Sequence, residues 1–179
     1  MTLLVKFGFD KEVKLKLYLD MDGVIADFFG KIEEIYDLNH WKDLEDPLLT
    51  IKGLKNTDFF NTLNVFPTSD RLVTACMEIA GRNYGICTSP ILDDEMNTGY
   101  WKRVWLERHG YLPDIVNLII DKNKSKYANE QISGEPNILV DDKPSNIKAW
   151  NDAGGIGLLY QANENDVEEL ISDIRYAYS

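Results

Sequence analysis

Short apolar segments recur along the chain, and most of them end at acidic or hydroxyl residues before a more polar stretch begins. Short apolar runs that alternate with helical segments are typical of a parallel sheet covered on both faces. We therefore predict an α/β fold with a Rossmann-like parallel sheet flanked by helices. The predicted strands are residues 13–19, 84–87, 115–120, 138–140 and 156–160.

Helical periodicity appears in the stretches between and after these strands. Ser69 is a suitable N-cap for the first of them, and Gly110 is a suitable stop for the second. Residues 1–12 have an ambiguous pattern, and an extra edge strand is one interpretation. The predicted helices are residues 69–80, 93–109, 144–152 and a last segment that contains Val167, Leu170, Ile171 and Ile174.

Residues 28–67 depart from this alternation. The segment has no convincing strand, is rich in aromatic residues, and is interrupted by Pro47 and Gly53. A long irregular loop is one alternative, but a structureless loop of about 40 residues is unusual in a compact domain. We therefore predict a small helical insertion over residues 28–67, set into a core domain formed by residues 1–27 and 68–179.

Composition limits the class of partner. The chain has 179 residues, of which 44% are hydrophobic, which fits one compact domain with a modest insertion. Its net charge of −11 repels nucleic-acid backbones and anionic membranes. We expect neither a nucleic-acid polymer nor a membrane as partner, and a monomer or homodimer as the assembly.

Two further features point to a location inside the cell. The first residues do not resemble a signal peptide, and no apolar run approaches the roughly 18 residues of a membrane-spanning helix. Cys76 and Cys87 lie in apolar segments, so we expect two buried reduced thiols. The prediction is a cytoplasmic protein.

Acidic residues follow two of the predicted strands. Asp20 and Asp22 come after the first strand, with Gly23 allowing a tight turn, and Asp141 and Asp142 come after the fourth. Ligands bind beyond the carboxyl ends of parallel strands, so these side chains should meet there. Two carboxylates about 4 Å apart repel by about 4 kcal/mol at an effective dielectric near 20. A hard divalent cation, Mg²⁺, is the expected compensation.

Candidate ligands for a phosphate follow two other strands. Thr88 and Ser89 come after the second strand, where hydroxyls and backbone amides can donate to phosphate oxygens. Lys122, Lys124 and Lys126 follow the third strand, and one ammonium directed into the crevice would hold a phosphate. The spacing alone does not choose between Lys124 and Lys126.

Taken in order, these motifs resemble those of the haloacid dehalogenase-like (HAD) phosphohydrolases. The three stretches that carry the resemblance are residues 20–28 (DMDGVIADF), 86–90 (ICTSP) and 139–144 (LVDDKP). Together with the intervening lysine they span about residues 14–160. Within this superfamily the chain is most similar to the 5'(3')-deoxyribonucleotidases, mainly through ADF and ICTSP.

The resemblance implies a fold, a cofactor and a set of roles. The fold would be a HAD-type sheet with a small helical cap inserted after the first motif strand. Asp20 would be the nucleophile and Asp22 the general acid and base, while Thr88, helped by Ser89, and Lys124 would bind the phosphoryl group. The implied Mg²⁺ ligands are Asp20, the backbone carbonyl of Asp22, Asp142 directly and Asp141 through water.

The expected substrate is a small phosphomonoester, most specifically a nucleoside monophosphate. Phe28 is the aromatic position that the family motif places beside the substrate, and a ring there can stack on a base. Most of the phenylalanines of the insertion are expected to form its own core instead. The alternatives are a phosphatase for another small ester, such as a sugar phosphate, and a non-catalytic binding module with the same fold.

Overall fold

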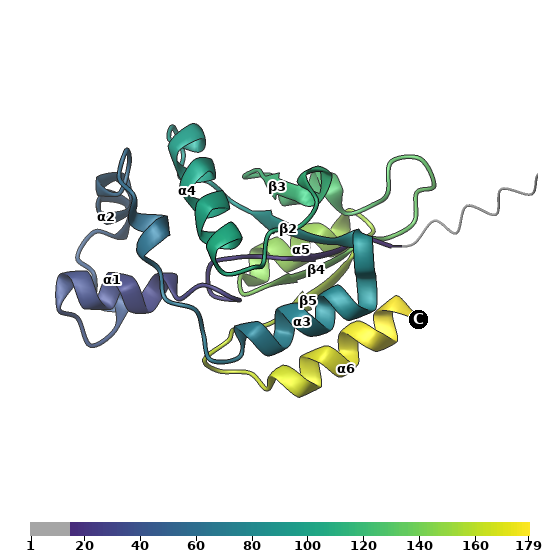
Figure 1. The fold of residues 1–179 in the computed structure, drawn as a ribbon. Helices are drawn as coiled ribbons and strands as arrows, with labels where there is room; N and C mark the ends of the chain where they lie inside the picture. Colours follow the sequence, from purple (N-terminus) through teal and green to yellow (C-terminus); the bar gives the residue numbers. More distant parts are fainter. Residues whose placement is uncertain (1–14) are drawn as a thin grey trace, which may run out of the picture.

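The computed structural model describes residues 15–179, and within them the predicted parallel α/β architecture is confirmed (Figure 1). The possible edge strand at residues 1–12 lies outside the described residues. Five parallel strands form one sheet in the order β3-β2-β1-β4-β5. They are β1 (Leu17–Leu19), β2 (Tyr84–Thr88), β3 (Leu118–Ile120), β4 (Ile138–Asp141) and β5 (Ile156–Leu159).

The strand order places a switch point at the centre of the sheet. From β1 the chain adds β2 and β3 on one side, then returns to add β4 and β5 on the other side of β1. Leu19 pairs with Val140, so the parallel register brings the next residues, Asp20 and Asp141, to the same level. Ligands of open α/β sheets bind at such switch points, which is where the predicted acidic residues lie.

Helices cover both faces of the sheet. α3 (Ser69–Ala80) and α6 (Val167–Tyr178) lie side by side on one face, and α5 (Pro144–Asp152) packs on β4 and β5 from the other (Figure 1). α4 (Glu95–Arg108) packs mainly against the inserted segment. Each of the four corresponds to a predicted helix.

Two local predictions are wrong. Residues 115–120 were expected to be one strand, but Ile115–Asn117 form a 3₁₀ turn, η4, and only Leu118–Ile120 join the sheet. The buried Asn117 side chain donates to the Arg82 carbonyl oxygen at 2.7 Å, which holds this turn apart from the sheet ladder. Ser69 does not cap α3: Thr68 holds that position, and the Ser69 hydroxyl donates to the Ile25 carbonyl oxygen at 2.8 Å.

Residues 28–67, all of which the structure describes, contain helices and turns and none of the five strands. The two ends of this segment lie together, because Asp27 N–H donates to the Asn64 carbonyl oxygen at 2.9 Å and Ala26 forms a bridge with Val65. α1 and α2 stand outside the two layers that cover the sheet (Figure 1). The elements are α1 (Phe28–Tyr36), η1 (Trp41–Asp43), α2 (Pro47–Gly53) and η2 (Phe59–Thr62).

Both cysteines are buried and free, as predicted. None of the helices within residues 15–179 combines the length and the apolar character that crossing a membrane requires.

Candidate active site at the carboxyl ends of the strands

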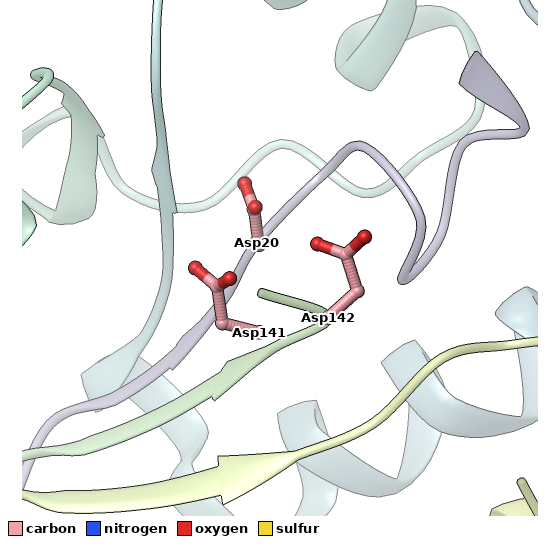
Figure 2. A group of neighbouring side chains, drawn as sticks. All are labelled: Asp20, Asp141 and Asp142. Carbon is pink, nitrogen blue, oxygen red and sulfur yellow. The ribbon is translucent and has the colours of Figure 1, made fainter. Parts of the chain in front are cut away.

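Three carboxylates gather at the switch point of the sheet. Asp20 follows β1, Asp141 ends β4 and Asp142 follows it, and Figure 2 shows their side chains pointing to the same side of the strand ends. One oxygen from each lies within 4.8 Å of the others. Asp20 is fixed at this point because its backbone N–H donates to the Val140 carbonyl oxygen at 2.8 Å.

A buried lysine lies between two of these carboxylates. Lys124, in η5 (Lys124–Tyr127), places its Nζ 2.7 Å from Asp20 Oδ2 and 2.6 Å from Asp141 Oδ2. Burial alone would lower the pKa of Lys124, but the two ion pairs outweigh it and raise the pKa. Lys126 instead lies on the surface, 3.1 Å from Asp121, and Lys122 is exposed. The structure therefore brings Lys124, and not Lys126, to the acidic cluster.

The two adjacent acids of the cluster differ in their surroundings. Asp141 accepts hydrogen bonds from the Lys143 backbone at 2.9 Å and from the Asn146 side chain at 3.0 and 3.1 Å, besides its ion pair. Among residues 15–179 no donor contacts the Asp142 carboxylate. Burial and the nearby Asp20 charge raise the pKa of Asp141 to about 6 and that of Asp142 to about 7. Asp142 is thus the acid whose negative charge is least compensated by neighbouring groups.

The cluster has the charge and the ligand chemistry that suit a divalent cation. Three carboxylates and one ammonium carry a combined charge of two negative units. Their carboxylate oxygens are the type of ligand that Mg²⁺ prefers. Gly23 keeps the approach to Asp142 open: at its φ of 79° a side chain would be strained, and a Cβ would lie 2.4 Å from Asp142 Oδ2. A role of Gly23 in substrate binding stays a prediction.

A second buried lysine, which the sequence analysis did not find, contacts two of the predicted residues. Lys102 of α4 is fully buried, and its Nζ lies 2.7 Å from Asp22 Oδ2 and 2.7 Å from Thr88 Oγ1. Burial raises the pKa of Asp22, and the Lys102 charge opposes that rise. Helical periodicity does not reveal this lysine, because Thr98, Lys102 and Trp105 share the buried face of α4 and two of the three are polar.

Ser89 and Phe28 are the remaining predicted residues. Ser89 is partly buried in the loop between β2 and α4. Phe28, the first residue of α1, is partly exposed, and its ring meets those of Phe59 and Phe60 at centroid distances of 5.4 and 6.1 Å. Phe59, Phe60 and Phe66 are buried, as expected for the core of the insertion.

Comparison with known proteins supports the fold that the sequence motifs implied. No family model matches the chain. The HAD domain of effector protein Lem4 from Legionella pneumophila (inactive mutant) is similar in structure, with a TM-score of 0.50 and 15% identity over 93% of this chain and 95% of that one. The chain has the HAD fold. A hydrolase from Streptococcus pneumoniae TIGR4 is similar to the same degree, with a TM-score of 0.51 and 12% identity over 90% and 98% of the two chains.

One curated protein is similar to this chain in sequence. The mitochondrial 5'(3')-deoxyribonucleotidase of Mus musculus is 27% identical in an alignment of 152 residues, and the match covers 73% of this chain. The match spans 65% of the length of that relative. The resemblance of the sequence motifs to the HAD superfamily is therefore confirmed, whereas substrate and reaction belong to the proposal that follows.

Proposed function

We propose that the protein is a magnesium-dependent phosphomonoesterase that uses Asp20 as a covalent nucleophile, and that its substrate is a nucleoside monophosphate. The observation that supports this most is the position of Asp20, held at the end of β1 beside Lys124, Asp141 and Asp142. A nucleophile, a cation and a further acidic pair in one place are what in-line phosphoryl transfer needs.

The reaction would proceed in two displacements. An Asp20 carboxylate oxygen attacks phosphorus in line, the bond to the leaving oxygen breaks, and an aspartyl-phosphate forms. Water then attacks the same phosphorus and releases phosphate together with the free carboxylate. Asp20 is an effective nucleophile because it is already oriented, and orientation can supply about 7 kcal/mol or more of the barrier. Lys124, buried next to Asp20, would hold a phosphoryl oxygen.

Asp22 would move the proton. It lies two positions after Asp20, and the burial that raises its pKa favours the protonated form that can donate to a leaving alcohol. In the second displacement the same group would accept a proton from the attacking water. The Thr88 hydroxyl and the loop with Ser89 would contact the phosphoryl oxygens from the neighbouring strand β2.

Asp20, Asp142 and the backbone carbonyl of Asp22 would hold the metal directly. Asp141, whose oxygens are already engaged by Lys124, Lys143 and Asn146, would contact it through water. The Mg²⁺ ion would supply charge neutralisation for the phosphoryl oxygens. Lys124 provides the same kind of stabilisation from the protein itself.

Residues 28–67 would act as a cap that selects the substrate. Phe28 and Phe29 are partly exposed at the start of the segment, where a ring can stack on a base. The relative from Mus musculus is named a deoxyribonucleotidase, which favours a nucleotide over other small phosphoesters.

A panel of substrates tests this proposal. The purified chain with Mg²⁺ is expected to release phosphate from deoxynucleoside or ribonucleoside monophosphates at least about tenfold faster, in kcat/KM, than from sugar phosphates. Phe28→Leu should reduce this preference, whereas Phe66→Leu, which changes a buried ring, serves as the control. Equal kcat/KM values for all substrates would contradict the nucleotidase proposal. Efficient turnover of sugar phosphates alone would favour a phosphatase for small esters of that kind.

A further inference from the structure

Lys102 is an unusual lysine because its side chain has no solvent exposure. Lysines are almost never fully buried unless they are paired. Here the ammonium lies 2.7 Å from Asp22 Oδ2 and 2.7 Å from Thr88 Oγ1. It therefore joins two residues of the proposed active site that belong to different strand ends.

At least two of the three donors of Lys102 are used within the protein. An ammonium has three protons and no acceptor. Two of them are directed at Asp22 and Thr88, and the charge lies 4.6 Å from the ring centroid of Phe60, a distance at which the ring face attracts it. Because two donors are engaged and the side chain has no solvent exposure, Lys102 acts on the reaction mainly through these neighbours.

The contact with Thr88 determines what the hydroxyl can do. Because Lys102 can only donate, Thr88 Oγ1 is the acceptor in this hydrogen bond. The single hydroxyl proton of Thr88 then points away from Lys102. It is available to donate to a phosphoryl oxygen.

The contact with Asp22 fixes the orientation of its carboxyl group. Oδ2 is held by Lys102, whereas Oδ1 is shielded from solvent and has no hydrogen-bond partner among residues 15–179. A buried oxygen without a partner is costly, so one is expected from the substrate. Oδ1 is thus the oxygen left to face a leaving group.

We propose that Lys102 is a positioning residue that presets Asp22 for proton transfer and Thr88 for phosphate binding. This inference rests on the proposed phosphomonoesterase function. The inserted segment supports the arrangement, since α4 is also tied to it by the Trp105 indole N–H, which donates to the Leu63 carbonyl oxygen at 2.8 Å. Docking of that segment and alignment of the acid are therefore linked through one helix.

The test compares two leaving groups. In Lys102→Met, kcat for a deoxynucleoside monophosphate should fall by about 10³-fold, because its alcohol needs a proton from a well-placed Asp22. For p-nitrophenyl phosphate, whose leaving group departs as an anion, the loss should be at least about tenfold smaller. Arg103→Met, which changes an exposed cation next along α4, should keep kcat within about twofold of the unchanged chain for both substrates.

A second pair of variants tests whether Lys102 acts through Asp22. In an Asp22→Asn chain, adding Lys102→Met should change kcat for the nucleotide by less than about threefold, because residues that act as one unit are not additive. The loss of the Thr88 contact should appear in KM instead, since that contact serves phosphate binding. The double variant carries neither charge of the buried Lys102–Asp22 ion pair, so it can be compared with Asp22→Asn even where Lys102→Met alone fails to fold. Radiolabelled substrate makes the low rates measurable.

The outcomes separate this inference from the proposed function. Equal losses for both leaving groups, unchanged activity in Lys102→Met, or additive effects in the Asp22→Asn background would each overturn the positioning role alone. If the wild-type chain had no activity on any phosphomonoester, the proposed function would be overturned, and this inference with it.

Discussion

Replacing Asp20 by asparagine is expected to lower kcat for every phosphomonoester substrate by about 10⁴-fold or more, because an amide oxygen cannot serve as the nucleophile. The fold should be retained. Asn keeps the size of the side chain, and the backbone N–H still donates to the Val140 carbonyl oxygen. The variant loses the charge that pairs with Lys124, but Lys124 keeps its ion pair with Asp141 and the repulsion of Asp20 with Asp141 and Asp142 disappears, so the melting temperature of the metal-free variant should change little.

Asp121→Asn is the matched control for this experiment. Asp121 also follows a strand end, that of β3, but it pairs with Lys126 on the surface and lies outside the acidic cluster. Its variant should keep kcat within about threefold of the unchanged chain. If Asp20→Asn retained substantial turnover, the covalent mechanism would have to be abandoned.

Replacing Lys124 by methionine should damage both stability and activity. The change leaves the buried Asp20 and Asp141 carboxylates without their cation, and breaking such a buried pair costs about 3 kcal/mol or more of unfolding free energy. Loss of a phosphate-binding charge should also lower kcat/KM by about 10²- to 10³-fold. Because the variant cluster carries more negative charge, Mg²⁺ should raise its melting temperature by more than it raises that of the unchanged chain.

Lys126→Met provides the comparison, since this lysine is two positions away and its partner Asp121 is partly exposed. Thermal melts at pH 8 and steady-state kinetics on both variants give the result. A Lys124→Met chain as stable and as active as Lys126→Met would show that Lys124 has no special role in the cluster.

The sequence alone was sufficient to predict the features that depend on the alternation of strands and helices and on the residues that follow each strand. Buried parallel strands are nearly continuous apolar runs, so β1, β2, β4 and β5 could be located from hydrophobicity. Once these strands are parallel and adjacent, the residues that follow them must lie at one edge. That geometry is why Asp20, Asp22, Asp141 and Asp142 were expected to meet. Asp20, Asp141 and Asp142 do form one cluster, whereas the Asp22 carboxylate pairs with Lys102 instead.

Features that depend on side-chain partners were not accessible in this way. Ile115 and Val116 look like a strand, but they are exposed in a turn that the buried Asn117 amide helps to hold. Lys102 looks like a solvated position of α4, because a lysine is counted as polar unless its buried partners are known. Asn146 is similar: its contact with Asp141 depends on how α5 packs, which periodicity does not specify.

Titration of Mg²⁺ into the metal-free chain by isothermal calorimetry shows whether a divalent cation binds at the ends of β1 and β4. Mg²⁺ competes with protons for the cluster, and the pKa of Asp142 is raised to about 7 by burial and by the Asp20 charge. Affinity should therefore increase by about tenfold per pH unit below pH 7, where the ion must displace a proton. It should level off above that pH, where Asp142 is already ionised.

Asp142→Asn should weaken this binding strongly, whereas Asp121→Asn should leave it unchanged. We expect one bound ion per chain, which binds more tightly at pH 8 than at pH 6 and is lost together with the Asp142 charge. Absence of binding at pH 8, or binding that is insensitive to both pH and Asp142→Asn, would contradict a divalent-cation site at the ends of β1 and β4.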